Sequence, residues 1–295
     1  MIPRLDMARL LAGDADALAE LRRGAHEVGF LVVGNTGLDA AGVIAAYRGF
    51  FAQDVAVKSR VDMAVTGANR GWGAPKSEQV DPDANPDYKE VFDCGFELPA
   101  GDAQAGLSVY APNQWPGLDG FREVVQGYYT AACCVAMDLL RVLAGAIGER
   151  AAYFDDKFTR PMALLRGNYY PARPDWAGER DFGIAAHTDY GCLTLLASDG
   201  VPGLEVELRD GTWLAVEAAP GEFVINFGEM LEMWTGGAVK ATLHRVRGSK
   251  AERISVPLFF NPNWDADVAP AGGAPVLAGA HLEKRFRETY LHLKG

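Results

Sequence analysis

Apolar residues in the second half of the chain occur in short runs, between Met162 and Phe260, that Gly, Pro and Asp interrupt. The last of these runs alternates. One set of alternate positions is apolar throughout: Ile254, Val256, Leu258 and Phe260. The other set begins with a cation and a hydroxyl: Arg253, Ser255, Pro257, Phe259 and Asn261. Because successive strand residues point to opposite faces, the pattern predicts a strand with one face in the core.

Helical spacing of apolar residues appears on both sides of these runs. Leu18, Leu21, Ala25 and Val28 predict a helix, and Phe30 to Val33 predict a strand after it. Residues 39–53 predict a second helix, and an apolar stripe from Asp119 to Ile147 predicts a long helix that buttresses the core. Residues 282–293 predict a C-terminal helix. The segment 67–86 is rich in Gly, Pro, Asp and Asn, which predicts a loop placed to serve as a lid.

These elements predict a mainly β protein with helices, whose core is a double-stranded β-helix, or jelly roll. We expect an N-terminal α/β region over residues 1–110 that packs on a core of long helix and jelly roll over residues 111–295. At 295 residues, of which 49% are hydrophobic, the chain can bury a substantial core. The two regions are therefore expected to form one integrated unit.

Charge and composition narrow the class of protein. The formal net charge is −11, with 28 basic residues scattered among 39 acidic ones, which argues against a nucleic-acid surface. The first residues lack the apolar core of a signal peptide, and no apolar stretch is expected to approach a membrane span of about 20 residues. We therefore expect a cytoplasmic protein that binds neither nucleic acid nor membranes. The sequence leaves the oligomeric state open and is compatible with a monomer. Packing roles are expected for all four cysteines: Cys94, Cys133, Cys134 and Cys192.

Two histidines and an aspartate form the candidate metal site. His187 and Asp189 are two residues apart, so on a strand they share one face, and His244 follows 55 positions after Asp189. Two imidazoles and one carboxylate form the facial triad of non-heme Fe(II) oxygen chemistry, which leaves open positions on the metal. The alternative is a strand-end histidine that is hydrogen-bonded to a nearby carboxylate.

A second group of polar residues suggests a site for a dicarboxylic acid. The Arg253 guanidinium matches a carboxylate with two hydrogen bonds, and the Ser255 hydroxyl adds a third. The 2-oxo acid end of such a ligand would chelate the metal. Asn168 and Tyr170 share a strand face and can hydrogen-bond the same acid. The alternatives are a surface Arg in a salt bridge and a Tyr buried for packing.

The motifs that contain these residues resemble the isopenicillin N synthase-like family of Fe(II)/2-oxoglutarate-dependent dioxygenases. The matching segments are NYYP (168–171), HTDYG (187–191), VPGLEV (201–206), NFGEMLEMWTGG (226–237), HRV (244–246) and RISVPLFFNP (253–262). Upstream, IPRLDMARL, HEVGFLVV, YKEVFDCG and NQWP also resemble the family, so the likeness covers nearly the whole chain. It departs at Pro171, which is followed by Ala172 where many relatives have a second proline.

The resemblance implies an oxidoreductase that uses Fe(II), 2-oxoglutarate and O2 and releases succinate and CO2. The implied iron ligands are His187, Asp189 and His244. The implied 2-oxoglutarate contacts are Arg253, Ser255, Asn168 and Tyr170. The implied reaction is hydroxylation, desaturation or cyclisation of a small-molecule metabolite, such as an amino acid or an intermediate of antibiotic biosynthesis. Two alternatives stay open: an oxidase that draws all its electrons from its substrate, as isopenicillin N synthase does, and a metal-binding sensor without catalysis.

Five residues are candidates to contact the substrate. Phe259 can pack on an apolar or aromatic group, Asn261 can bind a polar group, and Arg166 can pair with a carboxylate. The alternatives are a core position for Phe259 and, for Arg166, an internal acid such as Glu222 or one beside Asp189. Weaker candidates are Tyr190 and Trp72.

Overall fold

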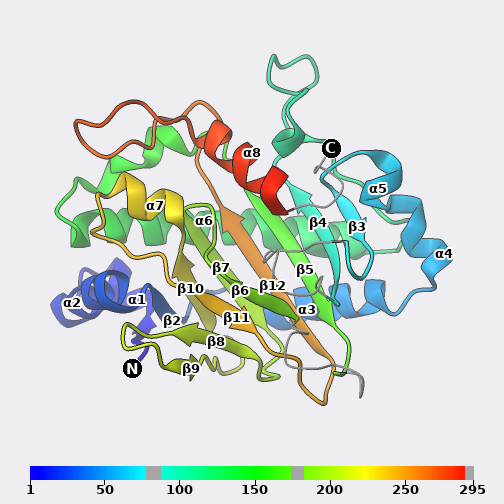
Figure 1. The fold of residues 1–295 in the computed structure, drawn as a ribbon, viewed down its shortest axis with the longest axis horizontal. Coiled ribbons are helices and arrows are strands. Elements are labelled where there is room, and N and C mark those ends of the chain that lie inside the picture. Colours follow the sequence, from blue (N-terminus) through cyan, green and yellow to red (C-terminus); the bar gives the residue numbers. More distant parts are fainter. Residues whose placement is uncertain (78–87, 174–182, 290–295) are drawn as a thin grey trace.

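Two antiparallel-rich sheets form the centre of the molecule. The computed structural model describes residues 1–77, 88–173 and 183–289. The large sheet has the strand order β1 (Arg4–Asp6), β2 (Phe30–Gly34), β10 (Phe223–Phe227), β7 (Leu193–Ser198), β12 (Arg253–Phe260), β5 (Leu164–Tyr170), β4 (Glu90–Gly95) and β3 (Gly71–Gly73) (Figure 1). The small sheet has the order β6 (Ile184–His187), β11 (His244–Val246), β8 (Leu204–Glu207) and β9 (Trp213–Ala215). This is the predicted jelly-roll core, with β1–β4 from residues 1–110 extending its large sheet on both edges.

Eight α-helices accompany the sheets in the described part of the chain. They are α1 (Met7–Leu11), α2 (Ala15–Arg23), α3 (Ala40–Phe51), α4 (Val55–Lys58), α5 (Met63–Thr66), α6 (Phe121–Ala146), α7 (Glu229–Trp234) and α8 (Ala278–Thr289). Short 3-10 turns cover Ser59–Val61, Ser108–Tyr110, Ala151–Tyr153 and Asp155–Lys157. A π-helix, Gly24–Val28, continues α2, so the first predicted helix is two helical segments. Gly29 ends it with a φ of 73°, a conformation that favours glycine.

Strand β12 confirms the alternation expected from its sequence. It pairs antiparallel with β5 on one side and with β7 on the other, so it lies inside the large sheet. Ile254, Val256 and Leu258 are completely buried in the main core. The opposite set lines a cavity on the other face: Arg253, Ser255, Pro257, Phe259 and Asn261. One strand thus separates the core from the cavity.

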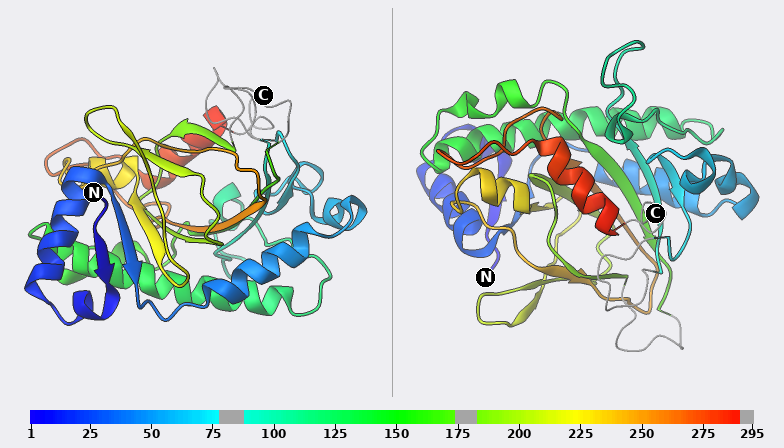
Figure 2. Two further views of the ribbon diagram at one scale, coloured as in Figure 1. Left: turned by 90° about the horizontal axis from the view of Figure 1, so that it is seen from below. Right: turned by 45° about the horizontal axis from the view of Figure 1, so that its top comes forward.

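The long helix α6 and helix α3 cover the core face of the large sheet, and the small sheet lies on its other side (Figure 2). Both helices direct apolar side chains at the strands, as the sequence predicts for the helix of 119–147. α6 also has the length and apolar composition of a membrane-spanning helix, so the expectation that no segment approaches this limit is wrong. Length and composition alone are weak evidence, because helices inside a protein core meet them too. The buried stripe of α6, from Phe121 to Ala144, belongs to the core.

Three other expectations need correction. The segment 67–86 is not a loop throughout, because Gly71–Gly73 forms β3 and pairs with β4; its residues from 78 onward lie outside the described chain, as does the lid suggested for them. The four cysteines do not all have packing roles, because Cys134 is exposed on α6. Cys133 is partly buried and packs against the main core. Cys94 and Cys192 are buried as expected. In the C-terminal helix, α8 begins at Ala278, ahead of the predicted start.

Close packing of α3 on β5 yields a stability prediction. A Cβ at Gly167 would lie 2.1 Å from the Tyr47 ring, which is completely buried and has no space to retreat. We expect Gly167→Ala to lower the free energy of unfolding by about 1–3 kcal/mol, as overpacking does. Gly127→Ala is the matched control, because Gly127 is exposed within α6 and has open space around it. That change should raise stability by up to about 1 kcal/mol in urea unfolding; equal effects at both positions would contradict the packing argument.

Candidate metal centre and active site

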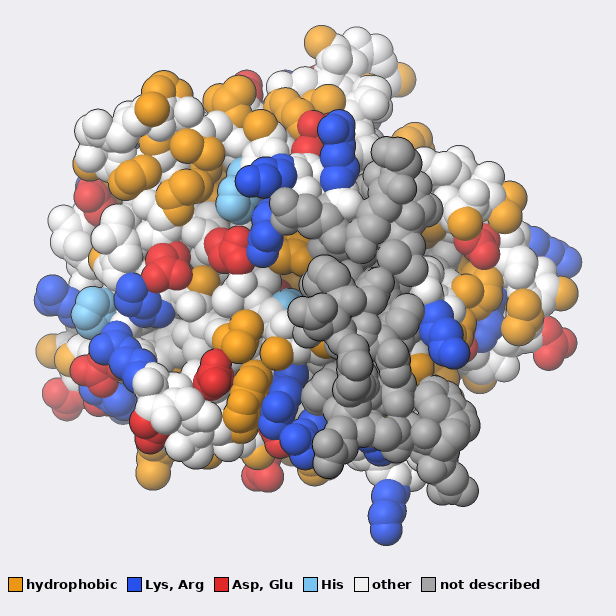
Figure 3. Space-filling model, viewed as in Figure 1, with side chains coloured by type: hydrophobic (Ala, Val, Ile, Leu, Met, Phe, Trp, Pro, Cys, Tyr) orange, Lys and Arg blue, Asp and Glu red, His pale blue; other side chains and the backbone are white. Residues whose placement is uncertain are grey.

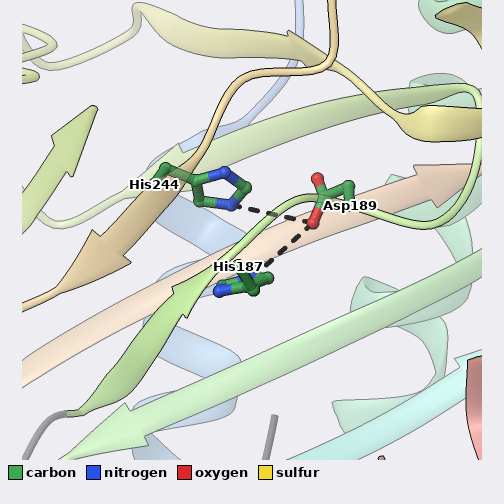
Figure 4. A group of neighbouring side chains, drawn as sticks. All are labelled: His187, Asp189 and His244. Carbon is green, nitrogen blue, oxygen red and sulfur yellow. Dashed lines mark ion pairs between the residues drawn. The ribbon is translucent and has the colours of Figure 1, made fainter. Parts of the chain in front are cut away.

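His187, Asp189 and His244 come together at the end of the small sheet. His187 is the last residue of β6 and His244 is the first of β11, and their Cα atoms are register partners. Asp189 lies just beyond β6, in the loop rather than in the strand. Its Oδ1 is 3.8 Å from His187 Nε2 and 3.7 Å from His244 Nε2 (Figure 4). One candidate ligand atom from each side chain lies within 4.8 Å of the others, a spacing that can hold one metal ion.

Backbone carbonyls fix both imidazole rings. His187 Nδ1 is 2.8 Å from the Ala185 carbonyl oxygen, and His244 Nδ1 is 3.0 Å from that of Thr242. Since a carbonyl accepts only from N–H, each Nδ1 carries a proton, and Nε2 is the nitrogen that faces Asp189. Burial lowers the pKa of His187 to about 4, with His244 as the next cause. The His187 ring is therefore neutral at neutral pH, as a metal ligand must be.

Two buried side chains that the sequence analysis missed hold the Asp189 carboxylate. Asp189 Oδ2 accepts hydrogen bonds from Thr194 Oγ1 at 2.5 Å and from Asn226 Nδ2 at 2.6 Å. Burial alone would raise the pKa of Asp189, but His244 and His187, with these two hydrogen bonds, bring it below its usual value. The carboxylate is charged, and with Oδ2 occupied, Oδ1 is the atom that faces the imidazoles.

Thr194 and Asn226 belong to one row of residues that crosses the large sheet. They are register partners across β7 and β10, and the row continues to Phe30 on β2 and to Phe259 on β12. The Phe30 ring meets the His244 ring edge-on, with centroids 5.3 Å apart. The available signal was a polar residue inside each of two mainly apolar strands: Thr194 in LTLLAS and Asn226 in FVINF. Such a residue in a buried strand needs a polar partner.

The four residues predicted to bind a dicarboxylic acid lie together across β5 and β12. Arg253 pairs in register with Tyr170, and Ser255 pairs with Asn168. Arg253 is 4% exposed; its Nε donates to the Val201 carbonyl at 3.2 Å, and its Cζ lies 5.0 Å from the centre of the Tyr170 ring. Within the described residues, Arg253 Nη1 and Asn168 Oδ1 are buried without a hydrogen-bond partner. A buried guanidinium nitrogen left in this state calls for an anion.

These residues surround a cavity of about 160 Å³ in the described part of the molecule. Its walls include the metal site and the Arg253 site, and four of the five substrate candidates: Arg166, Tyr190, Phe259 and Asn261. Apolar side chains make up much of the remaining wall, among them Met162, Leu164, Val109 and Leu282. Phe259, in the same row as Thr194 and Asn226, presents an apolar surface to the cavity. The cavity combines a metal site, an anion site and apolar walls, as ligand sites commonly do.

Three substrate candidates have internal partners or lie elsewhere. Arg166 makes a bidentate pair with Asp93, at 2.8 and 2.6 Å, so its acid is neither Glu222, which pairs with Arg4, nor one beside Asp189. The Asn261 amide accepts a hydrogen bond from Cys192 N and donates one to the Met162 carbonyl. It therefore ties the loop between β6 and β7, residues 188–192, to the large sheet; this loop carries Asp189 and is called the metal loop. Trp72 does not line the cavity among the described residues; its indole donates to Glu90. A substrate role for Arg166 stays a prediction.

The donor set fits a ferrous ion with a chelating oxo acid. Two imidazole nitrogens and one carboxylate oxygen converge, and the Arg253 nitrogen without a hydrogen-bond partner among the described residues faces the same cavity. Models of two families match the chain: the 2OG-Fe(II) oxygenase superfamily over residues 161–262, and the non-haem dioxygenase N-terminal region over residues 2–118. A 2-oxoglutarate-Fe(II) type oxidoreductase, hxnY of Emericella nidulans, is 33% identical over 84% of this chain and 75% of its own.

The chain belongs to the 2OG-Fe(II) oxygenase superfamily. A homoarginine-6-hydroxylase of Arabidopsis thaliana is 30% identical over 91% of this chain and 87% of its own. A Neurospora crassa protein whose crystal structure contains α-ketoglutarate and thymine superposes with a TM-score of 0.83, at 25% identity, over 97% of this chain and 96% of that one. The resemblance found in the sequence is thereby confirmed.

Membership establishes the class of reaction. The protein is an oxidoreductase, a dioxygenase that depends on Fe(II) and 2-oxoglutarate, consumes O2 and oxidises a small molecule. His187, Asp189 and His244 can hold the iron. The relatives support this reaction over an oxidase that works without 2-oxoglutarate.

Support of Asp189 by Thr194 gives a testable prediction. Thr194→Val removes the hydroxyl donor at almost constant volume, so Asp189 Oδ2 loses one of its two hydrogen bonds. Loss of such a contact to a metal ligand typically costs about 10- to 100-fold in metal affinity. We expect a Co(II) dissociation constant raised by at least about tenfold in anaerobic calorimetry. Thr130→Val, an exposed change whose hydroxyl bonds to its own helix, should leave it unaltered; unchanged binding in Thr194→Val would refute the support.

Proposed function

We propose that this dioxygenase hydroxylates a small metabolite with a largely apolar body, and that it binds 2-oxoglutarate through Arg253, Ser255, Asn168 and Tyr170. The observation that carries the assignment is Arg253 Nη1, which is buried at the cavity without a hydrogen-bond partner among the described residues. A carboxylate would satisfy it at little cost, because the guanidinium is already desolvated and fixed by Val201 and Tyr170.

The side chains divide the work of the reaction. Iron bound by the triad would supply the activation of O2, with electrons from the oxidation of 2-oxoglutarate to succinate and CO2. Arg253 and Ser255 orient the far carboxylate of 2-oxoglutarate, so that its oxo acid end is directed at the triad. Thr194 and Asn226 keep Asp189 Oδ1 aimed at the same point. The apolar walls exclude water from the reacting carbon.

The proposed substrate class follows from the apolar part of the cavity wall. Phe259 and Leu164 are register partners on β12 and β5, and Phe259 is only partly buried, so its ring is accessible to a ligand. Met162 and Leu282 extend this apolar surface. An aliphatic or aromatic group would bury these side chains from water and gain free energy in proportion to the area covered. The names of the relatives refer to small molecules as different as homoarginine and thymine, and so they do not identify one substrate for this chain.

We propose, further, a cytoplasmic monomer that binds neither membranes nor nucleic acid. All four cysteines are free, which is typical of a reducing compartment. On the face shown in Figure 3, basic and acidic side chains are intermixed over the coloured surface, unlike the clustered cations that phosphate backbones require. Size-exclusion chromatography with light scattering would test the monomer, since a mass of twice 31.7 kDa would contradict it.

Product stoichiometry tests the proposed reaction. Purified enzyme with Fe(II), 2-oxoglutarate and O2 would be screened against a panel of small apolar metabolites and polar counterparts. We expect one succinate and one CO2 per hydroxylated product, with apolar members preferred. His187→Ala should abolish succinate release, because one of three metal ligands is lost. Retained 2-oxoglutarate turnover in that variant, or product without succinate, would exclude the proposed mechanism.

Substitution of Arg253 tests the cosubstrate site separately. Arg253→Leu removes the buried cation, and truncation of such a charge partner costs about 2 kcal/mol or more, a factor of roughly thirty. We expect the KM for 2-oxoglutarate to rise by at least that factor, with Co(II) affinity unchanged. Arg150→Leu, an exposed change of the same kind, is the control. An unaltered KM in Arg253→Leu would place the 2-oxoglutarate site elsewhere.

A further inference from the structure

Helix α8 closes one side of the cavity. Leu282 is 2% exposed and forms part of the cavity wall, while Ala278 is completely buried. The first turn of α8 is fixed by backbone hydrogen bonds from Ala278 to Ala266 and from Gly279 to Trp264, both at 2.9 Å. The Trp264 ring lies where a Cβ at Gly279 would stand. The start of this wall is therefore anchored to Trp264 and Ala266.

The next turns of α8 rest on the loop that carries Asp189. His281 Nε2 is 3.1 Å from the Tyr190 carbonyl oxygen, and the Arg285 guanidinium lies 4.5 Å from the centre of the Tyr190 ring. Arg285 Nη2 also donates to Glu229 Oε1 at 2.9 Å. These contacts join the helix to the residue next to a metal ligand and to the first residue of α7.

Glu229 also holds the metal loop itself. Its backbone N–H donates to the Asp189 carbonyl at 2.8 Å, and its Oε1 accepts a hydrogen bond from Thr188 Oγ1. Thr188 lies between the two ligands His187 and Asp189. Glu229 Oε1 thus accepts one hydrogen bond from Thr188 in the metal loop and one from Arg285 on α8.

We propose that Glu229 is a positioning residue with two separable roles: through Thr188 it sets the metal loop, and through Arg285 it holds the α8 wall against that loop. The part of this inference that concerns the substrate rests on the proposed function, since Leu282 belongs to the apolar wall that we assign to the substrate. Opening of α8 beyond its anchored first turn would move Leu282 away from the cavity and admit a ligand, while the loop keeps its position.

The strength of the contacts fits a wall that opens reversibly. The side chains of Arg285 and Glu229 are 32% and 30% exposed, so water screens their attraction. Ion pairs of this exposure shift an equilibrium by about two- to fivefold. The metal loop, in contrast, is held by backbone hydrogen bonds from Gly228, Glu229 and Met230. Loss of Arg285 should therefore loosen α8 and leave the metal site intact.

Hydrogen exchange measures the α8 role without any substrate. In Arg285→Ala, we expect the amides of residues 281–285 to exchange about two to five times faster than in the unaltered protein, the factor that loss of such an ion pair implies. Lys284→Ala is the matched control: it removes a neighbouring exposed cation of α8 that makes no hydrogen bond or ion pair within the described residues. Equal exchange rates in all three proteins would overturn the α8 role.

Two substitutions of Glu229 separate its roles. Glu229→Gln keeps an oxygen that accepts from Thr188 but loses the charge that attracts Arg285, whereas Glu229→Ala loses both. We expect α8 exchange to rise in each, as in Arg285→Ala. The Co(II) dissociation constant should stay near the unaltered value in Glu229→Gln and Arg285→Ala and rise about tenfold in Glu229→Ala, the usual effect of removing support from a metal ligand.

The pattern across the variants decides the proposal. Weakened Co(II) binding in both Glu229 variants would mean that the charge itself supports the metal, and unweakened binding in both would mean that Thr188 needs no support from Glu229; either result overturns the two roles. Combining Arg285→Ala with Glu229→Gln should accelerate α8 exchange no further than either alone. Exchange and Co(II) binding require no turnover, so their failure is distinguishable from a failure to release succinate.

Discussion

Burial of the Asp189 carboxylate is the constraint on which the site depends. A charged carboxylate removed from water is costly unless hydrogen bonds and opposite charge replace its hydration. Asp189 obtains two hydrogen bonds from the large sheet, through Thr194 and Asn226, and faces two imidazoles from the small sheet. The carboxylate therefore joins the two sheets at one point, and a metal cation there would complete its compensation.

The large sheet supplies this support because each of its strands has two distinct faces. On β12, one face belongs to the core under α3 and α6, and the other presents Arg253, Ser255 and Phe259 to the cavity. Register then aligns Phe259 with Thr194 on β7 and Ser255 with Asn168 on β5. The residues of the anion site and the row that contains Thr194 and Asn226 thus lie on the same face of the large sheet, in different rows. A slip by one residue would turn all of these side chains into the core.

This division explains how much of the molecule could be predicted from its sequence. The alternation in β12 and the stripe of α6 are local patterns, and each predicted its element correctly. The spacing of His187 and Asp189 predicted that they share a site, but Asp189 lies in the loop after β6 and not on the strand. The Arg166 partner could not be predicted, because Asp93 is 73 residues away and meets Arg166 only through the β4–β5 register. Trp72 was misplaced for the same reason, since its strand packs beside Glu90 rather than the cavity. The pairing register of distant strands decided the partner of Arg166 and the position of Trp72, and this register cannot be derived from local sequence patterns.

The Arg166–Asp93 pair also bears on the substrate. Both side chains are buried, and a bidentate pair leaves little net charge for a ligand to recognise. The pair also joins register partners on neighbouring strands, so it stiffens the junction of β4 and β5. Substrate choice is therefore better placed on the apolar wall of Phe259 and Leu282, where dispersion and burial act without a fixed charge. The metal loop is held by sheets and backbone hydrogen bonds, whereas Leu282 is carried on a helix fastened by partly exposed side chains. The iron ligands, which need exact placement, are thus held by strong contacts. Leu282, which must adjust to a substrate, is held by weaker ones.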